Sequence, residues 1–349
     1  MHLTGHTQGR VGGQLKLRGP VYLAACAVVA LVFVPATGAS APPPEGAGRS
    51  ISQVYRVASL SPTFVDFSRP TPPNGTYPGS PHRVLPTLVL YPKEHKREHA
   101  QFPLIVFSHG FTASGPDYAS VLRPWVAHGY VVAAPTFPLS SGDAPGGPTI
   151  LDYPNQPGDV SFVITQMLRL DDTVGSPLFN LIDPQSIGVA GHSLGAITTL
   201  GVADNSCCKD NRIDAAVSIA GIELPFTGGT YFNGHTGPLL LIHGTADHTV
   251  PYAASQALYA DARFQTFFLT LDGAPHTAFF DPWRLVITHT VLAFFDRYLK
   301  HSSNVHQILL SGTVPGVASI QFRLHQQRHS SSVRSPMGDA TKSHVTTGN

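Results

Sequence analysis

The segment that most constrains how this chain can fold is Gly191-His192-Ser193-Leu194-Gly195. It follows an apolar run at 186–190 that is typical of a buried strand, and it precedes a helix-compatible stretch at 196–203. Glycine is favoured on both sides of a sharp turn, because side chains there would collide with the strand and the helix. The sequence therefore predicts a strand, a strained turn with the Ser193 hydroxyl at its tip, and a helix from Leu194 onward.

Two later segments carry side chains that could activate such a serine. A short strand pattern at 238–242 is followed by Asp247, and the next strand pattern, at 266–271, is followed by His276. A serine hydroxyl is a weak nucleophile near neutral pH, so it needs a base that takes its proton and an acid that fixes the tautomer of that base. We therefore predict Ser193 as the nucleophile, His276 as the base and Asp247 as the acid.

A fourth segment fits the same arrangement. Another buried-strand pattern, at 103–107, leads into a glycine-containing loop at 108–113. The backbone N–H groups of Phe111 in this loop and of Leu194 are the expected donors to the negative charge that develops on a carbonyl oxygen during acyl transfer.

Three further histidines lie close to these segments. His248 is the rival of His276 as the base, but its place next to Asp247 in the sequence is poor geometry for the bond between acid and base. His109 and His192 are expected to shape the site through packing and hydrogen bonds rather than through proton transfer.

Taken together, the four segments resemble the secreted α/β-hydrolases. The resembling group includes cutinase-like polyester hydrolases, dienelactone-hydrolase-like proteins and platelet-activating-factor acetylhydrolase-type esterases. The resemblance covers residues 54 to 320 and rests on residues 109–113, 191–195, 244–247, 250–251 and 273–276. It implies carboxylic-ester hydrolysis with no metal and no organic cofactor. Dienelactone hydrolases carry a cysteine where Ser193 stands, and polyester hydrolases usually carry a disulfide near the C-terminus, whereas this chain has no cysteine after Cys208.

Strand and helix patterns alternate along the chain, which predicts the α/β-hydrolase fold, with a mostly parallel central sheet and helices on both faces. The expected strands are 87–91, 104–107, 130–134, 187–190, 215–219, 239–242 and 267–271, and the expected helices are 117–128, 160–170, 194–203, 253–262 and 283–298. The connection at 221–238 is too short for a large cap domain, so we expect an open cleft. Its expected lining, besides Phe111, is Phe226, Tyr231, Phe232, Phe279 and Trp283.

The ends of the chain differ in composition from the rest. Residues 1–41 are typical of a signal peptide, because basic residues precede an apolar run at 21–34 that is shorter than the ~20 residues of a membrane-spanning helix. A cleaved signal is therefore favoured over an N-terminal anchor, and the protein is expected to be secreted or to lie in the cell envelope. We expect a Pro/Gly-rich linker at 42–52, the α/β-hydrolase domain at 53–322 and a disordered tail at 323–349.

Net charge and composition limit the classes of molecule that the protein is expected to bind. The formal net charge is +1 and no basic tract is interleaved with aromatic residues, which argues against nucleic-acid binding. The expected substrate is a small-molecule or polymeric ester, with contact to lipid or the envelope as a further option, and a monomer is expected. The 18 histidines form no convincing set of metal ligands, because His95 and His99 lie in a charged segment typical of a solvated turn. For the adjacent Cys207 and Cys208, a pair of thiols is favoured over a strained disulfide ring.

Three functions remain open from the sequence. The leading hypothesis is a serine esterase of the lipase-like or cutinase-like kind that works through an acyl-enzyme. The second is an acyltransferase of the cell envelope on the same fold. The third is a catalytically silent hydrolase fold that binds a ligand, against which the intact set of Ser193, Asp247 and His276 argues.

Overall fold

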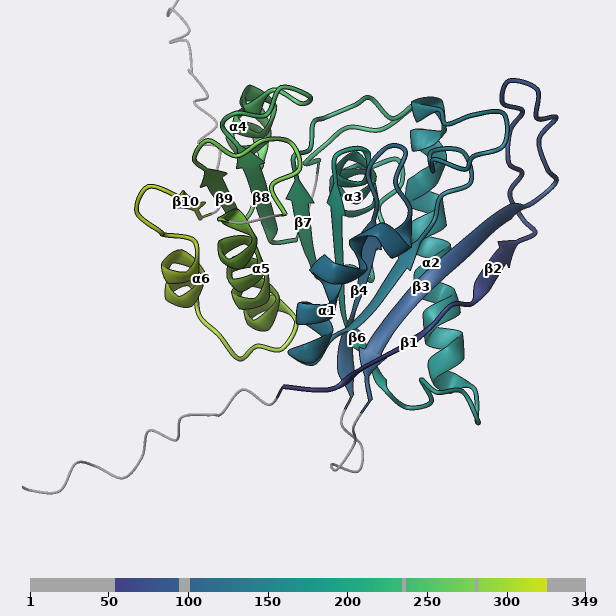
Figure 1. Ribbon diagram of the computed structural model, residues 1–349, viewed down its shortest axis with the longest axis horizontal. Helices are drawn as coiled ribbons and strands as arrows, with labels where there is room; N and C mark the ends of the chain where they lie inside the picture. Colours follow the sequence, from purple (N-terminus) through teal and green to yellow (C-terminus); the bar gives the residue numbers. More distant parts are fainter. Residues whose placement is uncertain (1–53, 94–100, 234–236, 280–281, 325–349) are drawn as a thin grey trace, which may run out of the picture. The chain divides into compact units, whose positions relative to one another are not determined.

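The computed structural model describes residues 54–93, 101–233, 237–279 and 282–324 (Figure 1). These residues all belong to the larger of two units into which the chain divides, residues 50–349. The predicted signal peptide, the predicted linker, His95, His99 and the predicted tail beyond residue 324 lie outside the described residues. Across the described ranges, none of the helices combines the length and the apolar character that crossing a membrane requires.

Ten strands of the described residues form one mixed sheet in the order β1-β3-β5-β4-β6-β7-β8-β9-β10, with β2 paired to β3. The strands are β1 (Val57–Leu60), β2 (Thr63–Asp66), β3 (Arg83–Pro92), β4 (Phe102–Ser108), β5 (Val131–Pro135), β6 (Ile182–His192), β7 (Ala215–Ile219), β8 (Leu239–Gly244), β9 (Thr266–Leu271) and β10 (Ala318–Arg323). The block from β5 to β9 is parallel, whereas β3 and β10 pair antiparallel with its two ends. The sheet is therefore mostly parallel at its centre, as predicted.

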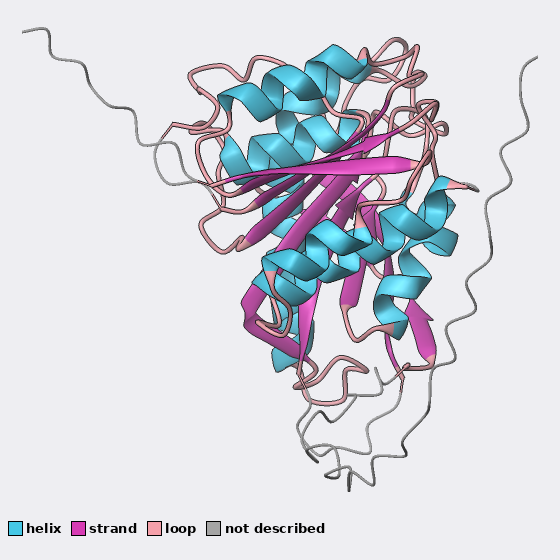
Figure 2. Cartoon of the chain, turned by 90° about the vertical axis from the view of Figure 1, so that its left-hand side faces the viewer, coloured by secondary structure: helices cyan, strands magenta, loops and turns pink. Residues whose placement is uncertain are grey.

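Helices cover both faces of this sheet (Figure 2). They are α1 (Ala119–Ala127), α2 (Gln156–Asp172), α3 (Leu194–Asp204), α4 (Tyr252–Asp261), α5 (Trp283–Tyr298) and α6 (Val305–Ser311). Side chains of α1, α5 and α6 belong to one hydrophobic cluster, and side chains of α2, α3 and α4 belong to another. The two clusters lie on opposite faces of the sheet.

Alternation along each central strand explains the two clusters. Ile105 and Phe107 of β4 pack with α1 and α5, while Leu104 and Val106 of the same strand pack with α2 and α3. Successive side chains of a strand point to opposite faces, so a strand that is buried on both sides is a continuous apolar run. All seven residues of β4 are buried, so packing on both faces holds this strand, and the loop that follows it begins from a fixed position.

The edges of the sheet differ from the prediction. β1, β2 and β10 were not predicted as strands, because none of them is a continuous run of buried apolar side chains. β10 includes Arg323, whose guanidinium donates to the carbonyl oxygens of Tyr259 and Ala260 at 2.8 and 3.2 Å. The folded region therefore extends beyond the predicted boundary at 322, and pairing of β10 with β9 anchors its C-terminal end without a nearby cysteine.

Cys207 and Cys208 lie in the loop that follows α3. The structure places their two sulfur atoms in contact, as in the disulfide that the sequence favoured less than a pair of thiols. The loop turns sharply at Asn205, whose side-chain oxygen accepts the Cys207 N–H and whose carbonyl oxygen accepts the Cys208 N–H, at 3.1 and 3.2 Å. This turn holds the two adjacent side chains together.

Asp204, at the C-terminal end of α3, provides a test of stability. Its side chain is buried, and its Oδ2 atom has no hydrogen-bond partner among the described residues. Burial raises the pKa of Asp204 to about 7, whereas the pKa of an aspartate in an unfolded chain is ~3.9. The folded state therefore loses stability relative to the unfolded state as the pH rises from about 4 to 7.

Asp204→Asn should remove this pH-dependent loss. We expect the gain in the free energy of unfolding to be about 2–3 kcal/mol larger at pH 8 than at pH 5. Urea denaturation at both pH values measures it, with the exposed Asp172→Asn as the control. An equal change at the two pH values would contradict the raised pKa.

Candidate active site

The turn between β6 and α3 has the strained conformation that the sequence predicts. Ser193 stands between the last residue of β6 and the first residue of α3, with φ 57° and ψ −120°. A Cβ atom on Gly191 would lie 2.1 Å from the carbonyl oxygen of Gly195, and one on Gly195 would lie 2.0 Å from that of Ser108. Neither position can accept a side chain without a shift of backbone, so the two glycines allow the turn to form.

Three side chains from separate segments meet at this turn. The Oγ atom of Ser193 lies 2.9 Å from Nε2 of His276, and Nδ1 of His276 lies 2.7 Å from Oδ2 of Asp247. Asp247 follows β8 and His276 follows β9, so all three residues lie beyond the carboxyl ends of parallel strands. The structure thus brings together the three residues that the sequence singled out. His248, the rival base, has no such place between Ser193 and Asp247.

The loop after β4 lies beside the start of α3. The 2.0 Å approach of the Gly195 Cβ position to the Ser108 carbonyl oxygen shows how closely the end of β4 and the beginning of α3 pack. The Thr112 N–H donates to the Ser140 carbonyl oxygen at 2.8 Å, which fixes the loop immediately after Phe111. Leu194 is the first residue of α3, so its N–H has no carbonyl partner within the helix.

Comparison with known proteins agrees with this geometry. A model of the PET hydrolase-like family (PETase) matches residues 87–326, which is more than half of the chain. The chain belongs to the PET hydrolase-like family. Membership confirms the resemblance to cutinase-like polyester hydrolases and the α/β-hydrolase fold, and it supports an ester hydrolase. No curated protein gives a match to the chain.

Asp247, the predicted acid of this PET hydrolase-like chain, is held as an anion. Burial by itself raises the pKa of Asp247, but the hydrogen bond from His276 and the backbone N–H groups of Val250 and Thr249 outweigh it, so that the pKa lies below its usual value. The two N–H groups donate to Oδ1 at 2.9 and 2.8 Å, which leaves Oδ2 directed at His276. Asp247 is therefore ionised at neutral pH.

His243 is a residue of the site that sequence reasoning missed. Its Nε2 atom lies 3.1 Å from Oδ2 of Asp247 and 3.0 Å from the Val250 carbonyl oxygen, and its Nδ1 atom lies 2.7 Å from Oγ of Ser255. Burial lowers the pKa of His243, which keeps the ring neutral with its proton on Nε2, where two acceptors lie. Its position four residues before Asp247, at the end of β8, was the available signal.

Aromatic residues of the predicted cleft fall into two groups. Phe279 lines a cavity of about 310 Å³ together with Thr112, Tyr118 and His192, directly beside the base loop. Phe111 lies on the neighbouring loop and is 39% exposed. Trp283 begins α5, and its ring N–H donates to the Asp272 carbonyl oxygen at 3.1 Å, at the beginning of the loop that carries the base.

The other three predicted lining residues lie along α3. Phe226 is buried against Leu194 and Ile197 of α3. Phe232 is also buried, and its N–H donates at 2.9 Å to the carbonyl oxygen of Asp204, at the opposite end of α3 from Ser193. That end is roughly 15 Å away at 1.5 Å per helical residue, and Tyr231 lies beside it. Phe232 therefore does not line the cleft beside the serine, because the connection after β7 runs along α3, whereas the Tyr231 ring packs against the cluster of Leu194, Ile197 and Phe226.

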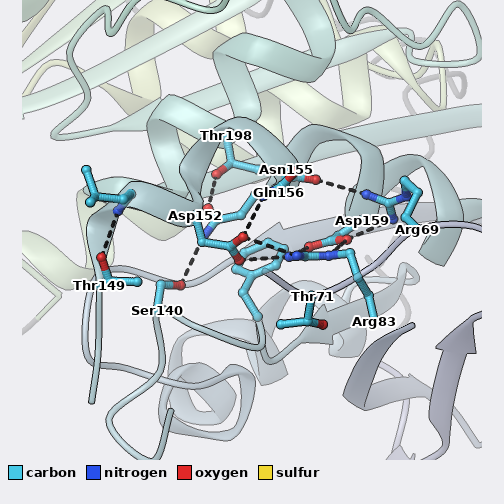
Figure 3. A network of polar contacts seen from close by, with 12 residues as sticks. Arg69, Thr71, Arg83, Ser140, Thr149, Asp152, Asn155, Gln156, Asp159 and Thr198 are labelled. Atoms are coloured by element: carbon cyan, nitrogen blue, oxygen red, sulfur yellow. Dashed lines mark hydrogen bonds and ion pairs between the residues drawn. The ribbon is translucent and has the colours of Figure 1, made fainter. Parts of the chain in front are cut away.

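A buried polar network lies between β3, α2 and α3, next to the loops of the site (Figure 3). The fully buried Arg83 binds Asp152 and Asp159, which joins the start of β3 to α2 and to the 3-10 segment before it. Gln156 donates to Oγ of Ser140 at 2.9 Å and accepts the hydroxyl of Thr198, one turn into α3. The network thus links the support of the loop around Thr112 to the helix that follows Ser193. Within the described ranges, no three histidine, cysteine or acidic side chains gather as metal ligands.

Proposed function

We propose that this PET hydrolase-like chain is a serine hydrolase that cleaves carboxylic esters through an acyl-enzyme on Ser193. The observation that carries the proposal is the continuous line of hydrogen bonds from Ser193 Oγ through His276 to Asp247, at 2.9 and 2.7 Å. Both distances lie within the range in which a base can take the proton of a nucleophile and an acid can orient that base.

The first half of the reaction forms the acyl-enzyme. Ser193 Oγ attacks the ester carbonyl carbon while His276 Nε2 takes the hydroxyl proton, and the carbonyl oxygen becomes an oxyanion. The N–H groups of Phe111 and Leu194 are the proposed donors to this oxyanion, and loss of one such donor typically costs about 10²- to 10³-fold in rate. The intermediate then collapses, the C–O bond to the alcohol breaks, and His276 returns the proton to the leaving oxygen.

The second half releases the acid. A water molecule gives its proton to His276 Nε2 and attacks the acyl carbon, and collapse of the second intermediate breaks the bond to Ser193 and returns its proton. Asp247 stays ionised throughout and stabilises the imidazolium form of His276 in both halves. Its lowered pKa supports this role, since it keeps the carboxylate charged near neutral pH.

Features around the serine favour bulky or extended esters. The cavity of about 310 Å³ beside His192 and Phe279 leaves room for an acyl or alcohol group. The exposed ring of Phe111 supplies an apolar edge that an extended aliphatic or aromatic chain could contact. Family membership supports a polyester as one such substrate. The proposed substrates are therefore lipid-type, acyl or polymeric esters.

Hydrolysis of p-nitrophenyl esters of graded acyl length by the pure protein tests the proposal. We expect hydrolysis well above the rate in buffer, and we expect a phosphonate that reacts with activated serines to stop it. Measuring the free acid as well as the released p-nitrophenol, with and without added alcohol, separates hydrolysis from transfer. A folded protein that cleaves none of the esters would contradict the proposal.

A further inference from the structure

His192 and Tyr118 form a buried pair beside the triad that the proposed reaction does not use. We infer that this pair is a positioning device that ties the loop carrying His276 to the loop carrying Phe111. The inference rests on the proposed function, because it concerns how the base and an oxyanion donor are held relative to Ser193.

The three hydrogen bonds have a single consistent direction. Nε2 of His192 lies 2.8 Å from the backbone carbonyl oxygen of His276, which can only accept, so the ring proton is on Nε2. Nδ1 of His192 is then an acceptor, and it lies 2.8 Å from the Tyr118 hydroxyl, which donates to it. The Tyr118 oxygen in turn accepts the backbone N–H of Gly110 at 3.2 Å. The chain of bonds therefore runs from Gly110 through both side chains to the His276 backbone.

Burial keeps this direction constant around neutral pH. His192 is 4% exposed and Tyr118 is 8% exposed. Burial lowers the pKa of His192 to about 4, and burial raises the pKa of Tyr118 to about 12. The imidazole of His192 thus stays neutral and the phenol of Tyr118 keeps its proton. Every donor in this series of hydrogen bonds therefore retains its hydrogen.

The space around Gly110 has the shape that this pair requires. A Cβ atom at Gly110 would lie 3.1 Å from the Tyr118 oxygen and 3.3 Å from Nδ1 of His192, tighter than ordinary contact. Phe279 packs against the pair on another side, with ring centroids 4.9 Å from His192 and 5.7 Å from Tyr118. The pair is therefore enclosed by the two loops that it joins.

The bonds reach the segments that place the reacting groups. Gly110 immediately precedes Phe111, the proposed oxyanion donor, and His192 immediately precedes Ser193. His276 contributes its carbonyl oxygen to the pair and its ring to the triad. Loss of the tie should allow the His276 loop and the Phe111 loop to shift relative to Ser193, and a displacement of about 1 Å can cost 10²-fold in rate.

Tyr118→Phe tests the tie, because it removes the hydroxyl and keeps the ring. We expect kcat per active site, counted by phosphonate titration, to fall about 10- to 100-fold. KM for p-nitrophenyl acetate, whose acyl group is too short to fill the cavity that Tyr118 lines, should change by less than about twofold. In His192→Phe, which removes both ring nitrogens, kcat per active site should fall by a similar factor. The double variant should be no slower than the slower single variant, because both residues act through one chain of bonds.

A matched control separates positioning from a general loss of stability. The Tyr130 hydroxyl is also buried, but it donates at 2.6 Å to Asp296 of α5 instead of to a residue of the site loops. Tyr130→Phe should lower the melting temperature while kcat per titrated site stays at the wild-type value. If Tyr118 had only a structural role, Tyr118→Phe would likewise lower the melting temperature and leave kcat per titrated site unchanged.

The outcomes distinguish the inference from the proposed function. If the wild type is titrated and active while Tyr118→Phe and His192→Phe match it in kcat per site, the tie is wrong and the proposed function stands. If the loss of kcat in the double variant equals the product of the two single losses, the inference is also wrong, since the two residues would then act independently. If the wild type neither hydrolyses esters nor reacts with the phosphonate, the proposed function itself fails.

Discussion

Ser193→Ala is expected to lower kcat for p-nitrophenyl esters by about 10⁶-fold, close to the rate without a nucleophile. The hydroxyl is the atom that would form the acyl-enzyme, and it is the group that hydrogen-bonds to Nε2 of His276 at 2.9 Å. Initial rates at saturating substrate, with the protein shown to be folded by circular dichroism, measure the loss.

A distant serine provides the control for this variant. Ser303 donates to the Ala293 carbonyl oxygen at 2.8 Å, outside the catalytic loops, and Ser303→Ala should keep wild-type kcat. If Ser193→Ala retains more than about one thousandth of the wild-type rate, a different group attacks the ester and the assignment of Ser193 is wrong.

Asp247→Asn is expected to lower kcat by about 10⁴-fold while leaving the fold unchanged. The Thr249 and Val250 N–H groups need an acceptor at Oδ1, so the amide oxygen of asparagine should take that position. Its NH₂ group would then face Nδ1 of His276 and force the imidazole proton onto Nε2. In that tautomer the base cannot take the proton of Ser193.

The rate of Asp247→Asn should be compared with that of Asp272→Asn, an exposed carboxylate on the loop that leads to His276. The control changes charge near the base loop but leaves the tautomer of His276 alone, so it should stay within about twofold of the wild type. A loss of less than 10-fold in Asp247→Asn would mean that another group orients the base.

The centre of the fold could be predicted from the sequence because its signals are local. Central parallel strands such as β4 and β8 are continuous apolar runs that end at glycine-containing loops, and every residue of these two strands is buried. The edge strands β1 and β2 lack such a run, since they bury side chains on one face or only partly. β10 depends on pairing with β9, which local sequence does not reveal.

The triad could be predicted because its members follow strands in a characteristic order. Neighbouring groups were missed when they act through contacts between distant segments. Tyr118 lies 74 positions from His192 and has no motif of its own. Arg83 occupies a strand start, where an arginine is usually solvated, yet it is fully buried between two aspartates. Phe232 was misplaced because sequence gives the length of the connection after β7 and not its path.

The most direct measurement of the central claim locates the residue that reacts with a phosphonate ester probe. The probe phosphorus accepts the activated oxygen and loses p-nitrophenolate, so the modified peptide can be identified by mass spectrometry. We predict one label per chain, on Ser193, with ester hydrolysis lost in proportion and with labelling slowed strongly in Asp247→Asn. Label on another residue, or full ester hydrolysis by protein fully labelled at Ser193, would contradict the account.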